Sequence, residues 1–109
     1  MIFSVAAADI REGTVHALRV DEGLALAVFL HEGKYHAVED KCPHRGGKLS
    51  EGELAGGLLV CPLHHFKFAL KDYRCLMPRH LKLRSFPVSR DGDLLKIELE
   101  VEQDVPRPV

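Results

Sequence analysis

The sequence lacks features that mark several large classes of protein. No apolar run approaches the ~18 to 20 residues of a membrane-spanning helix, and the first residues have neither the basic nor the long apolar segment of a secretion signal. The formal net charge is only -1, which gives no overall attraction to nucleic acid or to an anionic membrane. These absences predict a cytoplasmic protein that binds neither nucleic acid nor a membrane.

Cysteine is scarce, and the motifs of common catalytic sites are missing. The three cysteines, Cys42, Cys61 and Cys75, cannot form a closed set of disulfides, and two of them have histidines nearby at metal-ligand spacing. We find no nucleophile paired with a base and no phosphate-binding glycine loop. Metal binding is therefore favoured over disulfide bonding, and the chain shows no catalytic site of these common kinds.

What is present is the composition of one globular domain. The 109 residues suffice for one domain but not for a second catalytic domain, and 46% of them are apolar and 28% charged. Residues 103–109, which read QDVPRPV, contain two prolines and no periodicity. We therefore expect one domain over residues 1–102 and a tail over 103–109.

Short alternating segments between turns predict an all-β, antiparallel fold. We expect strands at 14–20, 24–30 and 34–38, and then at 82–88 and 94–101, the last two flanking the hairpin signal Asp-Gly. In the final strand, four alternate side chains should face the core: Leu95, Ile97, Leu99 and Val101. A helical turn is expected only at residues 6–10. Between residues 39 and 73, where glycine and proline interrupt the period, we expect loops carried by the sheet.

Two cysteine and two histidine residues form the main candidate site. Cys42 and His44 are spaced C-x-H, and Cys61 and His64 are spaced C-x-x-H, so that each of two loops supplies one residue of each kind. Structural zinc sites usually pair like residues within a loop instead. In a two-iron, two-sulfide cluster, one iron can take both thiolates and the other both imidazoles. The spacing therefore favours such a cluster, with a zinc-stabilised binding module as the alternative.

The two loops, CPHRGGKLSEG and CPLHHFKF, resemble the Rieske iron–sulfur motif of bacterial Rieske-type ferredoxins. The resemblance extends over nearly the whole chain and implies a Rieske-like antiparallel β-sandwich, with a cluster-binding subdomain of two loops at about residues 40–80 inserted between strands. It also implies one [2Fe–2S] cluster per chain, with Cys42 and Cys61 on the inner iron and His44 and His64 on the outer one. The residues expected to surround or cover the cluster are Gly46, Gly47, Leu49, Leu63, His65, Phe66 and Pro78.

Several departures from this family refine the expectation. High-potential members have a disulfide between the loops and hydroxyl groups beside the cluster, whereas the corresponding positions here include Gly47, Leu63 and Phe66. We therefore predict a potential near the low end of the range of roughly -150 to +300 mV. His65 stands where the family usually has glycine, and we expect its ring at the exposed edge of the site. Asp72 and Tyr73 replace a common Thr-Gly turn.

The resemblance implies a one-electron carrier without catalytic residues of its own. A partner reductase would supply the electron, and an oxygenase or another oxidoreductase would receive it. The small subunit of an assimilatory nitrite reductase is the alternative within this fold. Seven basic residues lie between Lys67 and Arg90 against one acidic residue, so this stretch could steer an acidic partner if it lies near the site. The remaining histidines, expected on the surface or in strands, are His16, His31, His36 and His80, and Cys75 is expected to fill core space.

Overall fold

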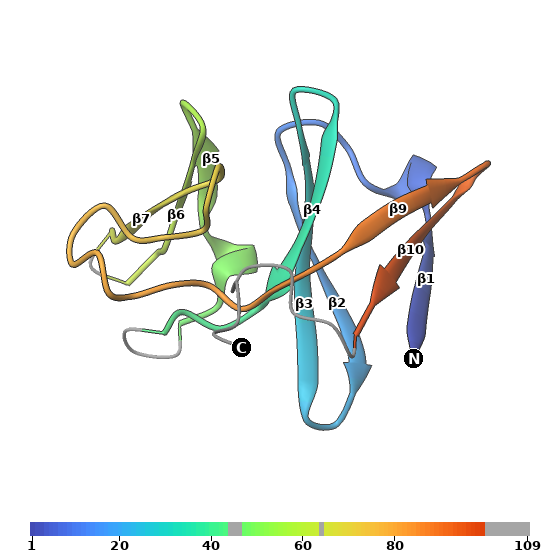
Figure 1. Cartoon of the computed structure of the whole chain (residues 1–109), viewed down its shortest axis with the longest axis horizontal. Coiled ribbons are helices and arrows are strands. Elements are labelled where there is room, and N and C mark those ends of the chain that lie inside the picture. The colour runs from blue at the N-terminus through green and yellow to red at the C-terminus, as the bar shows by residue number, and fades with distance from the viewer. Residues whose placement is uncertain (44–46, 64, 100–109) are drawn as a thin grey trace, which may run out of the picture.

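Antiparallel strands in three small sheets dominate the computed structural model, which describes residues 1–43, 47–63 and 65–99 (Figure 1). The strands are β1 (Ile2–Ala6), β2 (Val15–Asp21), β3 (Leu24–His31), β4 (Lys34–Glu39), β5 (Glu53–Ala55), β6 (Leu58–Val60), β7 (Lys67–Ala69), β8 (Ser85–Phe86), β9 (Val88–Asp91) and β10 (Leu94–Glu98). Two short 3-10 turns, η1 (Ala7–Asp9) and η2 (Leu49–Glu51), join some of them. The predicted antiparallel β architecture is confirmed.

The central sheet has the order β2-β3-β4-β8 and separates two hydrophobic cores. Its middle strand β3 has four consecutive residues that are completely buried, Leu26, Ala27, Val28 and Phe29. Leu26 and Val28 belong to one core, and Ala27 and Phe29 to the other. Because both faces of β3 are covered, the strand is an almost continuous apolar run in the sequence, without the usual alternation with polar residues.

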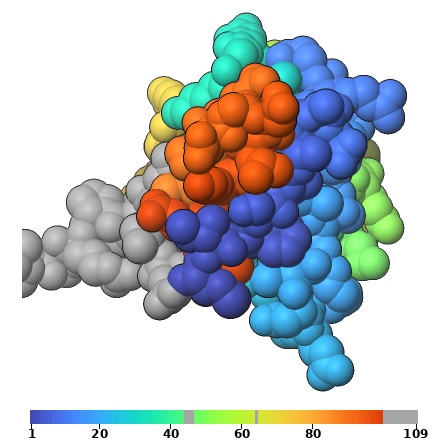
Figure 2. Space-filling model, turned by 90° about the vertical axis from the view of Figure 1, so that its right-hand side faces the viewer, coloured from blue at the N-terminus to red at the C-terminus, as the bar shows by residue number. Residues whose placement is uncertain are grey.

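A second sheet, of order β1-β10-β9, covers one face of the central sheet. Leu95 and Ile97 of β10 are completely buried against Leu26 and Val28, as the alternation predicted, and Leu99 is also buried. The predicted hairpin turn contains Gly92 with a φ of 61°, a value that glycine adopts readily. Figure 2 shows β1 and the β9–β10 hairpin together on one side of the molecule. Val101 lies outside the described residues.

The third sheet, of order β5-β6-β7, lies on the other side of the central sheet (Figure 1). Its inner face contributes Leu59 and Phe68 to a core that also contains Phe29 and Val38 of the central sheet. The prediction that residues 39–73 contain only loops was therefore wrong. Each of these strands is three residues long, which is too short to establish a period among so many glycines.

Two other expectations about the elements need correction. The strand β1 was not predicted, although it pairs along its whole length with β10. The strand expected at 82–88 is shorter, since the pairing with β4 is confined to Ser85 and Phe86, and β9 begins separately at Val88. The helical turn expected at 6–10 is present as η1. In the described ranges no helix is long and apolar enough to cross a membrane, and the predicted tail at 103–109 lies outside them.

Candidate functional site

The fold brings Cys42 and Cys61 together in the core between the central and third sheets. The two side chains are 1% and 0% exposed, and they belong to one apolar cluster with Leu49, Leu59 and Phe68. Their thiols lie close enough for Cys42 to help raise the pKa of Cys61, although the residues come from different loops. Two adjacent thiols can occupy two corners of one tetrahedral metal ion, so this pair fits the sulfur-ligated end of the predicted cluster.

The first loop is closed at its base by two sets of hydrogen bonds. The Cys42 N–H donates to the Gly47 carbonyl at 2.8 Å. Just outside this pair, the Asp40 carboxylate accepts from the Ser50 N–H at 2.7 Å and from the Ser50 hydroxyl at 2.6 Å. These contacts fix the position of Cys42. His44 and Gly46 lie outside the described residues.

The second loop connects β6 to β7 and has the same closure. The Cys61 N–H donates to the Phe66 carbonyl at 2.7 Å, which again joins residues five apart. His65 has a φ of 56°, which is a left-handed conformation that favours glycine. This explains why proteins with the resembling motif usually have glycine at the position of His65. The side chain of His65 is exposed, as expected. His64 lies outside the described residues.

Two glycines allow the loops to approach each other and the third sheet. A Cβ on Gly47 would lie 2.8 Å from Cδ1 of Leu63, so the absence of a side chain lets the first loop pack against the second. A Cβ on Gly52 would lie 2.0 Å from the Val60 carbonyl oxygen, which is a rigid backbone atom. Packing therefore requires glycine at position 52, whereas a side chain at position 47 would have to displace the partly exposed Leu63.

The environment of Cys61 keeps its thiol protonated when no metal replaces the proton. Burial raises the pKa of Cys61 to about 11, and the neighbouring Cys42 acts in the same direction. A backbone hydrogen bond from Leu63 opposes this effect by favouring the thiolate. The Cys61 thiol is therefore not an exposed, reactive nucleophile. A metal ion can supply the positive charge that a buried thiolate requires.

A third loop, residues 76–80, lies beside the second. It begins where the Leu76 N–H donates to the Lys67 carbonyl at 2.9 Å, and it contains a cis peptide bond between Met77 and Pro78. Leu76 and Met77 are exposed, whereas Pro78 is half-buried. This is the proline loop that was expected to cover the cluster.

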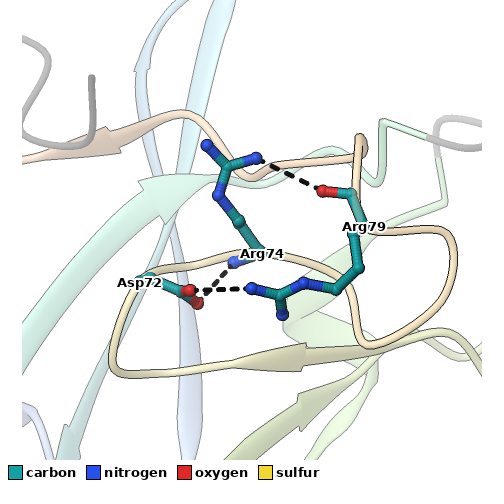
Figure 3. Close-up of polar contacts among 3 residues, drawn as sticks. All are labelled: Asp72, Arg74 and Arg79. Carbon is teal, nitrogen blue, oxygen red and sulfur yellow. Dashed lines mark hydrogen bonds and ion pairs between the residues drawn. The ribbon is translucent and has the colours of Figure 1, made fainter. Parts of the chain in front are cut away.

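Three charged residues brace the third loop (Figure 3). Asp72 accepts hydrogen bonds from the Arg74 N–H at 3.1 Å and from the Arg79 guanidinium at 3.2 Å. The Arg74 guanidinium donates in turn to the Arg79 carbonyl at 3.3 Å. The hydrogen bond from Arg74 and the charge of Arg79 lower the pKa of the Asp72 carboxyl. The brace therefore holds the third loop by both its backbone and its side chain.

The other predicted residues around the site differ in exposure. Leu49 is completely buried, and Phe66 is half-buried against the same core. Leu63 is 42% exposed, so it contacts Gly47 on one side and solvent on the other. Cys75 is 1% exposed and its Sγ lies 3.2 Å from the Met77 carbonyl oxygen, in agreement with its expected role as a core residue.

One polar contact in this core was not anticipated. His36 is 4% exposed, stacks on Phe29 at 5.0 Å and forms a 2.7 Å hydrogen bond through Nδ1 to the Tyr73 hydroxyl. Tyr73 has a φ of 61°, and it stands at the glycine position of the Thr-Gly turn that is common in the resembling family. His36 was expected on the surface or in a strand. Because side chains alternate between the two faces of a strand, His36 lies on the same face of β4 as buried Val38. This shared face was the signal in the sequence that could have predicted burial of His36.

Comparisons with known proteins give a consistent picture. Residues 2–87 match the family model described as the Rieske [2Fe-2S] domain. The chain is 36% identical over 104 residues to the 3-phenylpropionate/cinnamic acid dioxygenase ferredoxin subunit of Escherichia coli (strain K12), covering 94% of this chain and 96% of the relative.

Solved structures show the same fold. A chain in the complex of reduced oxygenase and oxidised ferredoxin of carbazole 1,9a-dioxygenase has a TM-score of 0.79 and 28% identity, over 88% of this chain and 91% of that one. A putative NADH-dependent nitrite reductase small subunit from Mycobacterium tuberculosis has a TM-score of 0.78 and 22% identity, over 89% and 93%. At this lower identity the second match indicates the fold alone.

Proposed function

Because the chain belongs to the Rieske [2Fe–2S] family, we propose that Cys42 and Cys61 bind the inner iron of its cluster and that His44 and His64 bind the outer iron. The predicted resemblance, cofactor and electron-carrier function agree with the family match and with the ferredoxin subunit relatives. When bound, the cluster accepts and releases one electron. The observation that carries the ligand assignment is that two thiols from separate loops are buried near each other in one apolar cluster, and that a backbone hydrogen bond closes each loop.

The chain's own residues would act by positioning the ligands and limiting access of water. The hydrogen bonds of Cys42 to Gly47 and of Cys61 to Phe66 would keep the thiols inside the core, in one apolar cluster with Leu49 and Phe68. The backbone hydrogen bond from Leu63 to Cys61 would remain available to stabilise negative charge on the ligand sulfur. In this proposal residues 1–102 act as one domain, and the segment of about 40–80 holds the cluster.

The proposed partners are a reductase that donates the electron and an oxygenase that accepts it. The relatives named as dioxygenase ferredoxin subunits support this pairing, as does the similarity to a chain in an oxygenase–ferredoxin complex. We propose that the protein is a component of such a system and does not itself catalyse the reaction of the final substrate. None of the three cysteines forms a disulfide, which agrees with the proposed location in the reducing cytoplasm.

Metal and sulfide analysis tests the proposed function. The purified protein should contain two irons and two acid-labile sulfides per chain and should bleach with dithionite. Cys42→Ser and Cys61→Ser should lose most of the cluster. Cys75→Ser provides a matched control, because Cys75 is equally buried but hydrogen-bonds within the third loop. A single zinc in place of iron would support the zinc-stabilised module, and copurification with a large flavin and sirohaem protein would support the nitrite reductase alternative.

A further inference from the structure

Charge is divided between two parts of the chain. The sequence from residue 41 to 82 has eight basic and three acidic residues, which gives a formal net charge of +5. The remaining residues have seven basic and thirteen acidic residues, which gives -6. The basic residues in 41–82 are Lys41, Arg45, Lys48, Lys67, Lys71, Arg74, Arg79 and Lys82, and the acidic ones are Glu51, Glu53 and Asp72. A net charge of -1 therefore conceals two parts of the sequence with opposite net charge.

The structure places part of the positive charge beside the ligand loops. Lys41 and Lys48 stand on either side of the first loop, Lys67 begins β7 directly after the second, and all three are exposed. Glu51 and Glu53 line a cavity of about 230 Å³ next to Cys61, so the acidic groups lie along one side of the site. The face formed by β1 and the β9–β10 hairpin lies on the opposite side of the molecule (Figures 1 and 2).

Three exposed apolar side chains lie in the second and third loops, near this positive charge. Leu63 in the second loop is 42% exposed, and Leu76 and Met77 in the third loop are 46% and 82% exposed. We call these three residues the docking patch. The main chain of Leu76 is hydrogen-bonded to that of Lys67, so apolar and basic side chains are adjacent. The Asp72–Arg74–Arg79 brace holds the third loop, and this reduces the entropy that Leu76 and Met77 would lose on binding.

We propose that the docking patch and the surrounding lysines bind a redox protein whose electron-transfer face is an apolar surface with an acidic rim. This inference rests on the proposed function, because it concerns the partner that exchanges electrons with the cluster. Apolar contact supplies short-range affinity, whereas the positive field raises the encounter rate with an acidic partner and orients it. A basic partner would meet the same apolar patch but be repelled by the field.

Two electron acceptors of opposite charge test the sign of the field. The reduced protein is mixed with an acidic blue-copper protein or with cytochrome c, which is basic, and one electron passes to Cu(II) or to ferric haem. Raising the salt from 0.01 M to 0.15 M shortens the Debye length from about 30 Å to about 8 Å. The second-order rate should fall roughly tenfold or more with the acidic acceptor and should rise or stay constant with cytochrome c.

Matched variants locate the interaction. Lys67→Glu should lower the low-salt rate with the acidic acceptor by roughly three- to tenfold, whereas Lys34→Glu at the far end of β4 should change it by less than about twofold. Met77→Asp should lower the same rate by about tenfold, and Met1→Asp should leave it unchanged. Met77→Ser replaces Met77→Asp if the charged variant does not assemble a full cluster. All rates are compared at equal iron and sulfide content.

Nuclear magnetic resonance gives a readout that requires no electron transfer. The chain contains two methionines, so methyl-labelled protein gives one signal from Met77 and one from Met1, and Met77→Leu assigns them. The oxidised protein is titrated with the reduced blue-copper protein. The Met77 signal should shift or broaden at low salt and recover at high salt, while the Met1 signal should stay unchanged.

The outcomes separate this inference from the proposed function. A protein that contains no iron–sulfur cluster would contradict the proposed function and the docking inference with it. A loaded protein that shows the same salt dependence with both acceptors, or equal effects of Lys67→Glu and Lys34→Glu, would overturn the docking inference alone. Equal responses of Met1 and Met77 would also overturn it.

Discussion

The buried His36–Tyr73 pair should make the stability of the fold depend on pH. Burial, followed by the charges of Lys34 and His31, lowers the pKa of His36 from 6.5 to about 4. The ring is 4% exposed, stacks on Phe29 and is hydrogen-bonded to Tyr73. Protonation of His36 therefore places a charge where little water can solvate it.

The direction of the effect follows from the two states. In the unfolded chain His36 binds a proton as the pH falls through 6.5, whereas in the folded chain it remains neutral until about pH 4. Between these values the unfolded state binds more protons, so the free energy of unfolding falls as the pH falls. One pKa unit corresponds to about 1.4 kcal/mol. His36 should therefore account for a loss of roughly 2.5 kcal/mol between pH 7.5 and 4.5.

Urea unfolding followed by far-UV circular dichroism measures this contribution. The wild-type protein and His36→Phe are compared at pH 7.5, 6.5, 5.5 and 4.5. The difference between their free energies of unfolding should change by roughly 2.5 kcal/mol in favour of the variant as the pH falls. Release of the cluster on unfolding is common to both proteins and cancels in this difference. His80→Gln, which changes an exposed histidine, is the control and should run parallel to the wild type.

Parallel pH profiles for the wild-type protein and His36→Phe would refute the reasoning. They would mean that His36 takes up its proton in the folded state about as easily as in the unfolded one. A direct check is the chemical shift of the His36 ring in the folded protein, whose titration midpoint should lie near 4. A midpoint at 6 or above would lead to the same conclusion.

Three further predictions concern the cluster and its loops. With histidine on the outer iron, the reduction potential measured by voltammetry should fall at alkaline pH by up to about 59 mV per unit for each proton lost, and a constant potential up to pH 10 would contradict histidine ligation. His64→Cys should lower the reduction potential if the cluster assembles, because the thiolate adds negative charge. His64→Ala should lose the cluster, and full retention of the cluster in this variant would exclude His64 as a ligand. Gly47→Ala should destabilise the protein by roughly 1 to 3 kcal/mol in urea unfolding, because the alanine Cβ meets Leu63. Adding Leu63→Ala to the same chain should remove part of this destabilisation. Additive effects of the two substitutions would show that the residues do not touch.

The sequence predicted those parts of the fold that local patterns specify. Strands β2, β3, β4 and β10 were predicted because each is long enough to show its apolar side chains between clear turns. The 3-residue strands β5, β6 and β7 were missed, because their pairing is set by a core shared with Phe29 and Val38 of distant strands. Strand β1 was missed for a similar reason, since its partner β10 is at the other end of the chain.

The same distinction applies to the candidate site. The spacing of the cysteines and histidines identified the candidate ligands, and the structure brings Cys42 and Cys61 together in one buried cluster. The contact between His36 and Tyr73 joins residues 37 positions apart, and no local pattern encodes it. Tyr73 also occupies a left-handed conformation that would suggest glycine at that position. The packing of its ring and its hydrogen bond to His36 offset the strain.

The candidate site of this protein is built into its hydrophobic core, and this rigid placement suits the transfer of electrons. The two thiols are members of the apolar cluster that joins the central sheet to the third sheet, and each is fixed by the backbone hydrogen bond that closes its loop. A thiol held in this way cannot move without disturbing the packing of Leu49, Leu59 and Phe68. A change of one charge at the cluster should therefore cause little rearrangement of the protein. The exposed, basic and apolar groups lie outside this rigid part, where different partners can contact them without altering the ligands.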